Sequence, residues 1–376
     1  MRILHIISSS GMYGAEAVIL NLSRTLNEGQ HSSILGVFSN SSNPNLQLHE
    51  AATREGIESH LIPCQGQVDR TAIAAIRELA VRLRADVVHA HGYKADIYVY
   101  FALRKSGIPF VSTCHNWIDD NLMSNLYGKA DRLVLRNFAA IAAVSGAVKQ
   151  RLVNAGVCEE KIRLVRNGID LRPFDNPSPL LGSRTSPEHL PTVGLVGRLG
   201  HEKGIDLFLR AAAVALKEFP SAKFVVAGDG PDLAKLELLI DDLKIRESVS
   251  MLGRRDDMPS IYASLDILVS SSRLEGLPMT ILEGMASRLA VVATPVGDVP
   301  TVVLNDRTGV LVPTEDVELL AARIVHLLRD SEMRTRLGTA ARQFVEDEFS
   351  AARMAAGYLA VYESAARDRE KRRDRK

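Results

Sequence analysis

The sequence lacks the features that mark secreted, membrane-spanning or nucleic-acid-binding proteins. It has only three cysteines in 376 residues and no CxxC pair, so neither a disulfide framework nor a structural zinc site is expected. No apolar run approaches the ~18 residues of a membrane-spanning helix, and the first apolar run is too short for a signal peptide. The 46 basic residues are balanced by 45 acidic ones, which argues against a nucleic-acid-binding domain. We therefore expect a cytoplasmic globular protein with no nucleic-acid partner.

Short apolar segments alternate with helical patterns along the whole chain. In the first half they cover residues 2–7, 86–91, 110–114, 140–145 and 162–166. In the second half they cover residues 192–197, 223–228, 249–253, 267–270, 290–294 and 309–312. Strands that alternate with helices form parallel sheets covered on both faces, so the pattern predicts an α/β protein.

A proline-rich stretch divides this pattern into two parts. Residues 171–191 have the composition of a linker, with Pro173, Pro177, Pro179, Pro187 and Pro191. We therefore predict two doubly wound Rossmann-like domains, an N-terminal one over residues 1–170 and a C-terminal one over 192–349. Because ligands of such sheets bind beyond the carboxyl ends of the strands, the two domains are expected to face each other across a ligand-binding cleft. A helix over about 350–366 is expected to pack back on the first domain, ahead of a charged tail over 367–376.

The charged tail and the first domain both carry an excess of positive charge. The tail has seven basic and three acidic residues, and the first domain has 18 basic and 15 acidic residues. Electrostatic attraction to anionic lipid headgroups is one interpretation of this excess. Evenly solvated charges on a freely soluble enzyme are the other. The sequence leaves both open.

Two strand-to-helix loops in the predicted second domain are suited to anion binding. Arg198 and Lys203 lie five residues apart across a glycine-bearing turn, so both can converge on one anion. In the other loop, Pro278 suits the first position of a helix, whose exposed amides favour an anion. A pair of solvated surface charges is the alternative interpretation of Arg198 and Lys203.

Two glutamates accompany the second loop. Glu275 precedes the expected helix and Glu283 lies about two turns into it. A carboxylate beside a phosphate site accepts hydrogen bonds from sugar hydroxyls or stabilises developing positive charge. Two phosphate-type loops in one domain therefore favour a nucleotide sugar as ligand, whereas an exposed helical residue is the alternative for Glu283.

Three histidines in the first domain are candidates for ligand or metal contacts. His89 and His91 alternate on a strand and project to one face, but no third ligand lies at a recognisable spacing, so no metal site is expected. His115 follows the strand at 110–114, where it can donate to a sugar hydroxyl or a phosphate, or pack as a structural residue. The chain has no Asp-x-Asp motif to hold a divalent ion against a diphosphate.

Together these residues resemble glycosyltransferase family 4, which comprises retaining nucleotide-sugar transferases of the GT-B architecture. The segment from Glu275 to Glu283 reproduces the E-x7-E motif of that family. Other segments that match are Gly197-Arg198-x4-Lys203-Gly204, AGDGP at 227–231, Val144-Ser145, Arg166-Asn167-Gly168-Ile169-Asp170 and His89-x-His91-Gly92. The resemblance covers nearly the whole chain, and the family is metal-independent, so neither a cofactor nor a divalent metal is expected.

The resemblance implies a role for each matching residue. Arg198 and Lys203 would bind the donor diphosphate. Glu275 would contact hydroxyls of the donor sugar beside the reacting carbon, and Glu283 would hold the ribose hydroxyls.

Further donor contacts are implied for five other positions. Amides near Gly276 and Leu277 would bind phosphate, and backbone near Arg254 would face the base. His115, which we expect to be catalytic together with Glu275, would lie by the donor sugar. The loop at Gly14 would lie against the diphosphate.

The implied activity is that of a retaining hexosyltransferase. It would move a sugar from a nucleoside-diphosphate sugar, a UDP-sugar rather than a GDP-sugar, to a glycan or lipid-linked acceptor in bacterial surface polysaccharide or glycoconjugate biosynthesis. Two alternatives remain, a nucleotide-sugar 2-epimerase of the same fold and a non-catalytic nucleotide-sugar-binding protein. A nicotinamide oxidoreductase is disfavoured because no complete G-x-G-x-x-G is present.

Overall fold

The chain forms two compact units in a computed structural model. One unit combines Met1–Gly168 with Ala351–Lys376, and the other is Ile169–Ser350. The structure describes residues 1–9, 11–12, 14–40, 45–66, 69–115, 131–182, 184, 186 and 189–373, with side chains as far as Arg367. Most of the charged tail expected at 367–376 therefore lies outside the described side chains.

The first unit is built on a parallel sheet of seven strands in the order β3-β2-β1-β4-β5-β6-β7. The strands are β1 Arg2–Ile7, β2 Ser32–Ser39, β3 Ser59–Pro63, β4 Val87–His91, β5 Phe110–Cys114, β6 Ala140–Ala143 and β7 Ile162–Leu164. The sequence pattern missed β2 and β3. β3 is an edge strand in which only Ile62 is buried, so it lacks the continuous apolar run that marks a buried strand.

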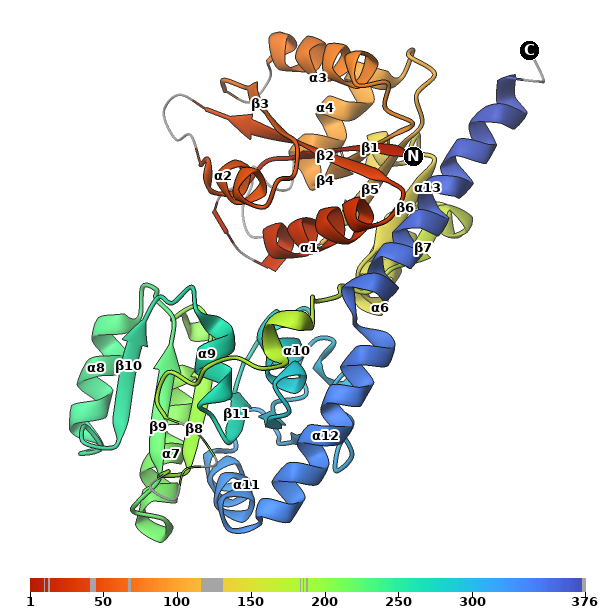
Figure 1. Cartoon of the computed structure of the whole chain (residues 1–376). Helices are drawn as coiled ribbons and strands as arrows, with labels where there is room; N and C mark the ends of the chain where they lie inside the picture. The colour runs from red at the N-terminus through yellow and green to blue at the C-terminus, as the bar shows by residue number, and fades with distance from the viewer. Residues whose placement is uncertain are drawn as a thin grey trace. The chain divides into compact units, whose positions relative to one another are not determined.

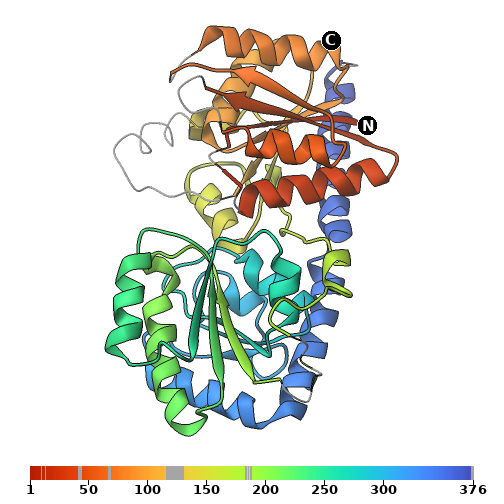
Figure 2. The same cartoon turned by 60° about the vertical axis from the view of Figure 1, so that its left-hand side comes forward.

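Helices cover both faces of this sheet (Figures 1 and 2). They are α1 Gly14–Glu28, α2 Gln47–Arg54, α3 Arg70–Arg82, α4 Tyr93–Leu103, α6 Gly146–Asn154, the short η1 Glu159–Lys161 and α13 Ala351–Arg373. On α1, the residues at helical spacing (Val18, Ile19, Leu22 and Leu26) are all buried. The last helix, α13, packs on α1 and on β4, β5 and β6, so the end of the chain completes the first unit.

The second unit is built on a parallel sheet of six strands in the order β10-β9-β8-β11-β12-β13. The strands are β8 Thr192–Val196, β9 Lys223–Ala227, β10 Val249–Gly253, β11 Ile267–Ser270, β12 Ala290–Ala293 and β13 Val310–Leu311. Its helices are η2 Arg172–Phe174, η3 His201–Lys203, α7 Ile205–Glu218, α8 Leu233–Asp242, α9 Met258–Ala263, α10 Met279–Ala286, η4 Val299–Thr301, α11 Val317–Arg329 and α12 Ser331–Glu348.

Side chains of the second sheet alternate between two apolar layers. Ile267 and Val269 of β11 belong to the layer formed with α7 and α11. Leu268, between them, belongs to the layer formed with α10 and α12. This alternation is the one that a strand buried on both faces requires.

The predicted α/β fold with two doubly wound sheets is confirmed. Every segment expected as a strand is one, and the bounds differ by at most two residues at either end. The proline-rich stretch 171–191 belongs to the second unit by its contacts. Phe174 is buried beside Tyr262, and the Leu180 amide donates to the Ser260 carbonyl. Among the described residues, no helix is both long enough and apolar enough to cross a membrane.

In each sheet, the direction in which successive strands are added changes beside the strand that comes first in the sequence. The neighbours of β1 are β2 and β4, and those of β8 are β9 and β11. Doubly wound sheets bind ligands at the carboxyl ends of the strands where the order reverses. The loops after β8 and β11 are therefore where a ligand of the second unit is expected, and these loops carry the two motifs that the sequence predicts to bind an anion.

Candidate functional site

The loop after β8 is held in one conformation by the loop after β11. Gly204 has a left-handed φ of +62°, and a Cβ there would lie 2.0 Å from the Ser271 carbonyl oxygen, so the position accepts only glycine. The Ser271 hydroxyl donates to the Gly204 carbonyl (2.7 Å), and the Arg273 amide donates to the Glu202 carbonyl (2.8 Å). These bonds fix Lys203, which lies between Glu202 and Gly204.

Lys203 and Glu275 form the centre of the candidate site. The Lys203 Nζ lies 2.5 Å from Glu275 Oε1, and the Ser272 hydroxyl donates to the same carboxylate oxygen (2.7 Å). The lysine stem runs along Gly197, where a Cβ would lie 3.7 Å from the nearest lysine methylene. Lys203 and Glu275, which belong to separate sequence motifs, thus lie together at the point where the strand order reverses.

Arg198 does not share this position. Its guanidinium is mostly exposed and pairs with Glu202 at 3.4 Å, whereas Lys203 pairs with Glu275. The expected convergence of Arg198 and Lys203 on one point is therefore not observed, because the two side chains pair with different glutamates. The arginine side chain is long and solvated, so rotation about its own bonds can change its partner.

Arg273 anchors the loop that carries Glu275, and the sequence analysis missed it. Its guanidinium donates to both carboxylate oxygens of Asp206 (2.7 and 2.8 Å) and to the His201 carbonyl (3.0 Å), and it also pairs with Glu315. The side chain is 17% exposed, so this bidentate pair is partly shielded from water. It holds the loop after β11 against η3 and the start of α7.

The backbone at the start of α10 is available for an anion. Pro278 was expected at the first helical position, but it is the residue that precedes the helix, with ψ at 121°, and Met279 begins it. Among the described residues, no side chain accepts a hydrogen bond from the amides of Met279 and Thr280, so these two donors retain their capacity, whereas the Ile281 amide donates to the Pro278 carbonyl at 3.2 Å. Gly276 is exposed, and a Cβ there would meet nothing within 4 Å, whereas Leu277 is half-buried.

Glu283 is half-buried and hydrogen-bonded, so the exposed-residue alternative is wrong. The phenol of Tyr262, from α9, donates to Glu283 Oε2 at 2.8 Å. Burial raises the pKa of Glu283 to about 7, and the Tyr262 hydrogen bond opposes that rise. Sequence reasoning missed Tyr262, because nothing in the local pattern of a tyrosine in a short helix indicates its partner on α10.

The remaining candidate segments of the second unit, Arg254 and the AGDGP turn, also follow strands and so lie at the carboxyl end of the second sheet. Arg254 is exposed and directly follows β10. In the AGDGP turn, a Cβ at Gly228 would lie 1.8 Å from the Gly197 carbonyl oxygen, and a Cβ at Gly230 would lie 2.4 Å from that of Leu199. These glycines let the turn pack against the loop that carries Arg198 and Lys203, so their role is close backbone packing.

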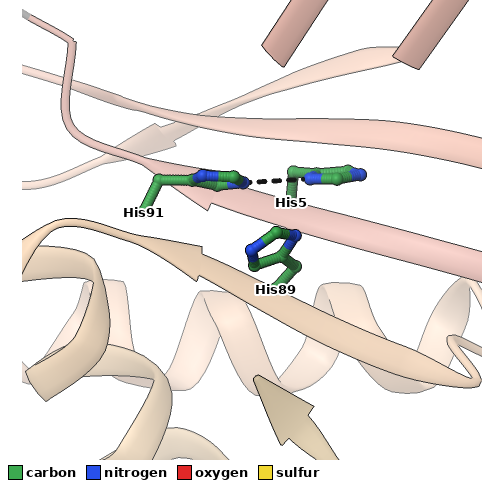
Figure 3. A group of neighbouring side chains, drawn as sticks. All are labelled: His5, His89 and His91. Atoms are coloured by element: carbon green, nitrogen blue, oxygen red, sulfur yellow. Dashed lines mark hydrogen bonds between the residues drawn. The ribbon is translucent and has the colours of Figure 1, made fainter. Parts of the chain in front are cut away.

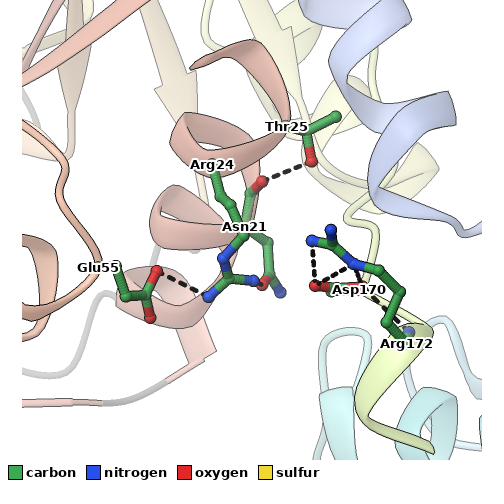
Figure 4. Close-up of polar contacts among 6 residues, drawn as sticks. All are labelled: Asn21, Arg24, Thr25, Glu55, Asp170 and Arg172. Carbon is green, nitrogen blue, oxygen red and sulfur yellow. Dashed lines mark hydrogen bonds and ion pairs between the residues drawn. The ribbon is translucent and has the colours of Figure 1, made fainter. Parts of the chain in front are cut away.

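The other matched turns are tied down by local polar contacts. Ser145 caps α6, since its hydroxyl accepts from the Val148 amide at 3.0 Å. Arg172 engages the carboxylate of Asp170 through two guanidinium nitrogens (Figure 4). Within the first unit, the same figure shows Arg24 of α1 paired with Glu55 at 2.7 Å, which holds the helix that begins at Gly14.

In the first unit, His115 directly follows β5 and contacts His91. The His115 Nε2 and His91 Nδ1 lie 3.2 Å apart, and the other His91 ring nitrogen, Nε2, lies 3.0 Å from His5 Nδ1 (Figure 3). Gly14 is the exposed first residue of α1.

A third histidine, His5, lies beside His89 and His91, and the spacing of residues in the sequence did not reveal it. Because β1 pairs with β4, His5 lies opposite His89, and candidate ligand nitrogens of His5, His89 and His91 all lie within 4.8 Å of one another. However, hydrogen bonds already engage both ring nitrogens of His89, one to the Tyr362 hydroxyl (2.8 Å) and one to the Thr113 hydroxyl (2.7 Å). A metal ion would have to displace these bonds.

Two doubly wound parallel sheets, with a lysine and a carboxylate paired on the loops that follow β8 and β11, are typical of a GT-B transferase that uses nucleotide sugars. The second unit matches the family model "Glycosyl transferases group 1" over residues 182–344, and residues 12–172 match "Glycosyltransferase Family 4". The chain belongs to glycosyltransferase family 4.

Characterised relatives span most of the chain. It is 25% identical over 335 residues to N-acetyl-alpha-D-glucosaminyl L-malate synthase of Bacillus anthracis, covering 86% of each chain. It is 26% identical over 282 residues to UDP-Gal:alpha-D-GlcNAc-diphosphoundecaprenol alpha-1,3-galactosyltransferase of Escherichia coli, covering 70% of this chain and 71% of that enzyme. The crystal structure of Anabaena HepE in complex with UDP has the same fold, with a TM-score of 0.80, 20% identity, and 97% of this chain and 100% of that one covered.

Proposed function

We propose that this glycosyltransferase is a retaining hexosyltransferase that uses a UDP-sugar as donor and a glycan or lipid-linked molecule as acceptor. The observation that carries the proposal is the Lys203–Glu275 pair beside the uncapped start of α10, because it joins a cation, a carboxylate and free amides in one place. The donor base is inferred from the names of two proteins that this chain resembles, one a UDP-Gal-dependent transferase and one solved with UDP.

We assign the diphosphate to Lys203, Arg198 and the amides near Gly276 and Leu277. When the donor's leaving group departs, negative charge builds on the diphosphate, and these groups stabilise it without a metal ion. Arrival of the diphosphate would draw Lys203 from Glu275 and Arg198 from Glu202. The freed Glu275 carboxylate would then accept hydrogen bonds from hydroxyls of the donor sugar.

The nucleoside is assigned to Glu283 and Arg254. Glu283 would hold the ribose hydroxyls, with Tyr262 fixing one of its carboxylate oxygens from behind. Backbone near Arg254 would face the base. From the first unit, we assign His115 to the donor sugar and Gly14 to the diphosphate. In this proposal, the first unit (about 1–170 with the last helix) also binds the acceptor, and the second (about 192–349) binds the nucleotide sugar.

The proposed reaction retains the configuration of the anomeric carbon. The bond from that carbon to the diphosphate oxygen breaks, and a bond to the acceptor oxygen forms on the same face. The acceptor's hydroxyl proton passes to the leaving diphosphate oxygen, so no carboxylate nucleophile is required. Glu275 would stabilise the positive charge that develops on the sugar.

We propose that the acceptor belongs to the biosynthesis of bacterial surface polysaccharides or glycoconjugates. We propose cytoplasmic action with peripheral contact to anionic lipid, which the excess of three positive charges over residues 1–170 and of four in the tail favours. A lipid-linked acceptor would then meet the enzyme at the inner face of the membrane.

A screen of sugar nucleotides tests the proposal and separates the alternatives. The protein is incubated with UDP-, GDP- and other nucleotide sugars, and mass spectrometry follows free nucleotide and changed sugar. Release of UDP with transfer to an acceptor or to water supports a transferase. Conversion of the sugar at its 2-position would instead identify an epimerase, and donor binding without turnover a non-catalytic binding protein.

A further inference from the structure

Three histidines of the first unit form a continuous row of hydrogen bonds that ends at His115. The pair His5 Nδ1 and His91 Nε2 lies at 3.0 Å, and the pair His91 Nδ1 and His115 Nε2 lies at 3.2 Å. His5 and His91 are buried, with 0% and 4% of their surface exposed, so water does not compete for the bond between them, whereas His115 is half-buried. Figure 3 shows the inner bond, with His5 and His91 on neighbouring strands.

The three rings are neutral, which limits how protons can be arranged. Burial lowers the pKa of His5 to about 3 and that of His115 to about 4, and it also holds the pKa of His91 well below its usual value. Each neutral imidazole carries one N–H and one lone pair. Each nitrogen-to-nitrogen hydrogen bond needs one proton between its two atoms.

These two conditions leave only two arrangements of the row. In the first, His5, His91 and His115 are all protonated at Nδ1. In the second, all three are protonated at Nε2. No mixed arrangement works, because it would place two protons or none between two facing nitrogens. The tautomer of His115 is therefore tied to that of His5, to which it is linked through the two hydrogen bonds of His91.

The far end of the row decides between the two arrangements. His5 Nε2 is buried and has no hydrogen-bond partner among the described residues. Protonation at Nε2 would leave a buried N–H without an acceptor, which folded proteins very rarely tolerate, whereas an unused lone pair on an acceptor is less unusual. The arrangement with all three protons on Nδ1 is therefore the more stable one.

We propose that the row of His5, His91 and His115 fixes His115 as the Nδ1–H tautomer, so that His115 acts on the donor sugar as a hydrogen-bond donor and not as a base. This rests on the proposed function, which places His115 at the donor sugar. His91 is then a positioning residue, since it contacts His115 and sets its proton without touching the donor. An oxygen of the sugar or of the leaving phosphate accepts from His115 Nδ1.

The tautomers can be read directly by nuclear magnetic resonance. In protein labelled with ¹⁵N-histidine, long-range ¹H–¹⁵N correlations distinguish a protonated ring nitrogen from a bare one, and single substitutions assign the signals of the ten histidines. We expect His5, His91 and His115 all to be protonated at Nδ1 at neutral pH. Protonation of His115 at Nε2, or a doubly protonated ring in the row, would overturn the proposal.

Two substitutions at His91 separate positioning from packing. In His91→Asn, an amide takes the place of Nδ1 but is no longer bonded to His5, so it can present either its NH2 group or its oxygen to His115; we expect the Nδ1–H tautomer to be retained in part and kcat to fall about threefold. In His91→Phe that donor is lost, and we expect His115 to become a mixture of tautomers and kcat to fall about tenfold with little change in donor KM. Equal losses in both variants would contradict a positioning role.

His89 provides the matched control, because its ring lies 4.0 Å from that of His91 but it has no hydrogen bond to the row. His89→Phe should leave the His115 tautomer unchanged. If the purified protein held one zinc ion per chain and His5→Phe lost it, the proposal would be overturned, because the metal would bind the ring-nitrogen lone pairs that accept the hydrogen bonds of the row. Wild-type turnover by His115→Ala would instead overturn the placement of His115 in the donor site, which is part of the proposed function.

Discussion

The ammonium of Lys203 lies 2.5 Å from the carboxylate of Glu275, across 72 residues of sequence. Both side chains are mostly buried, with 24% and 9% of their surfaces exposed, so each supplies the charge that the other needs. A diphosphate that takes Lys203 as its counter-ion therefore releases Glu275 for sugar hydroxyls. The pair couples the recognition of the two parts of a nucleotide sugar.

Loss of either cation should impair transfer far more than it impairs folding. Lys203→Ala and Arg198→Ala are each expected to lower transfer by at least about 100-fold at saturating donor, because each removes stabilisation of the departing diphosphate. Lys235→Ala and Arg329→Ala are matched controls, since these side chains are exposed and lie on α8 and α11. Activity within about threefold of wild type in Lys203→Ala or Arg198→Ala would refute the diphosphate assignment.

The two glutamates of the E-x7-E segment should differ in what they control. Glu283→Ala is expected to weaken binding of free UDP, because it removes the acceptor for the ribose hydroxyls. Glu275→Ala should leave UDP binding nearly intact and mainly lower turnover of the sugar donor. Calorimetry with UDP and initial rates with the donor measure the two effects. The reverse pattern would show that the two roles are exchanged.

Chelation should leave turnover unchanged. Lys203, Arg198 and the free amides of α10 supply the charge and the hydrogen bonds that a divalent ion supplies in other transferases. Donor turnover is measured in excess EDTA and after re-addition of Mg²⁺ or Mn²⁺. A loss on chelation that either ion restores would contradict the metal-free mechanism.

How much of this site could be predicted depends on how far apart in the sequence its partners lie. Glu275, Glu283, Arg198 and Lys203 were identified because strand, turn and helix signals are local, and each residue has a fixed offset from such a signal. The same signals placed nearly all of the strands.

The partners of these residues could not be predicted in this way. The contacts of Glu283 with Tyr262, and of His91 with His5, depend on which strands and helices become neighbours. A periodic pattern in one segment carries no information about the segment beside it. The edge strand β3 was missed for a related reason, since exposed residues do not give it an apolar run.

Association with membranes should require anionic lipid and should be strengthened by the charged C-terminal tail. We expect the protein to sediment with vesicles that contain anionic lipid at low salt, and to be released as salt rises, because screening weakens attraction between charges. Removal of the residues after Ala366 should reduce the bound fraction, since it deletes seven basic and three acidic residues. Neutral phosphatidylcholine vesicles are the control. Equal recovery in the supernatant with both kinds of vesicle would refute membrane association and leave the transferase assignment intact.

The raised pKa of Glu283 should make the stability of the protein depend on pH. Its pKa is about 7 in the folded chain, against an ordinary value of 4.5, so between these pH values the folded state holds a proton that the unfolded state has lost. The free energy of unfolding therefore falls as pH rises from 4.5 to 7, by about 3 kcal/mol from this group. In Glu283→Gln that loss is absent, so the variant should gain stability relative to wild type between pH 5 and pH 8.

Tyr262→Phe supplies the opposite control for this pH dependence. It removes the hydrogen bond that favours the ionised carboxylate, so the pKa of Glu283 should rise further and the loss of stability should extend to higher pH. Urea denaturation of the three proteins at pH 5, 6, 7 and 8 measures each slope. If the wild-type and Glu283→Gln curves ran parallel over this range, Glu283 would be ionised throughout and its burial would have no effect on its charge. A Tyr262→Phe curve that flattened at lower pH than wild type would show that the phenol does not stabilise the ionised form.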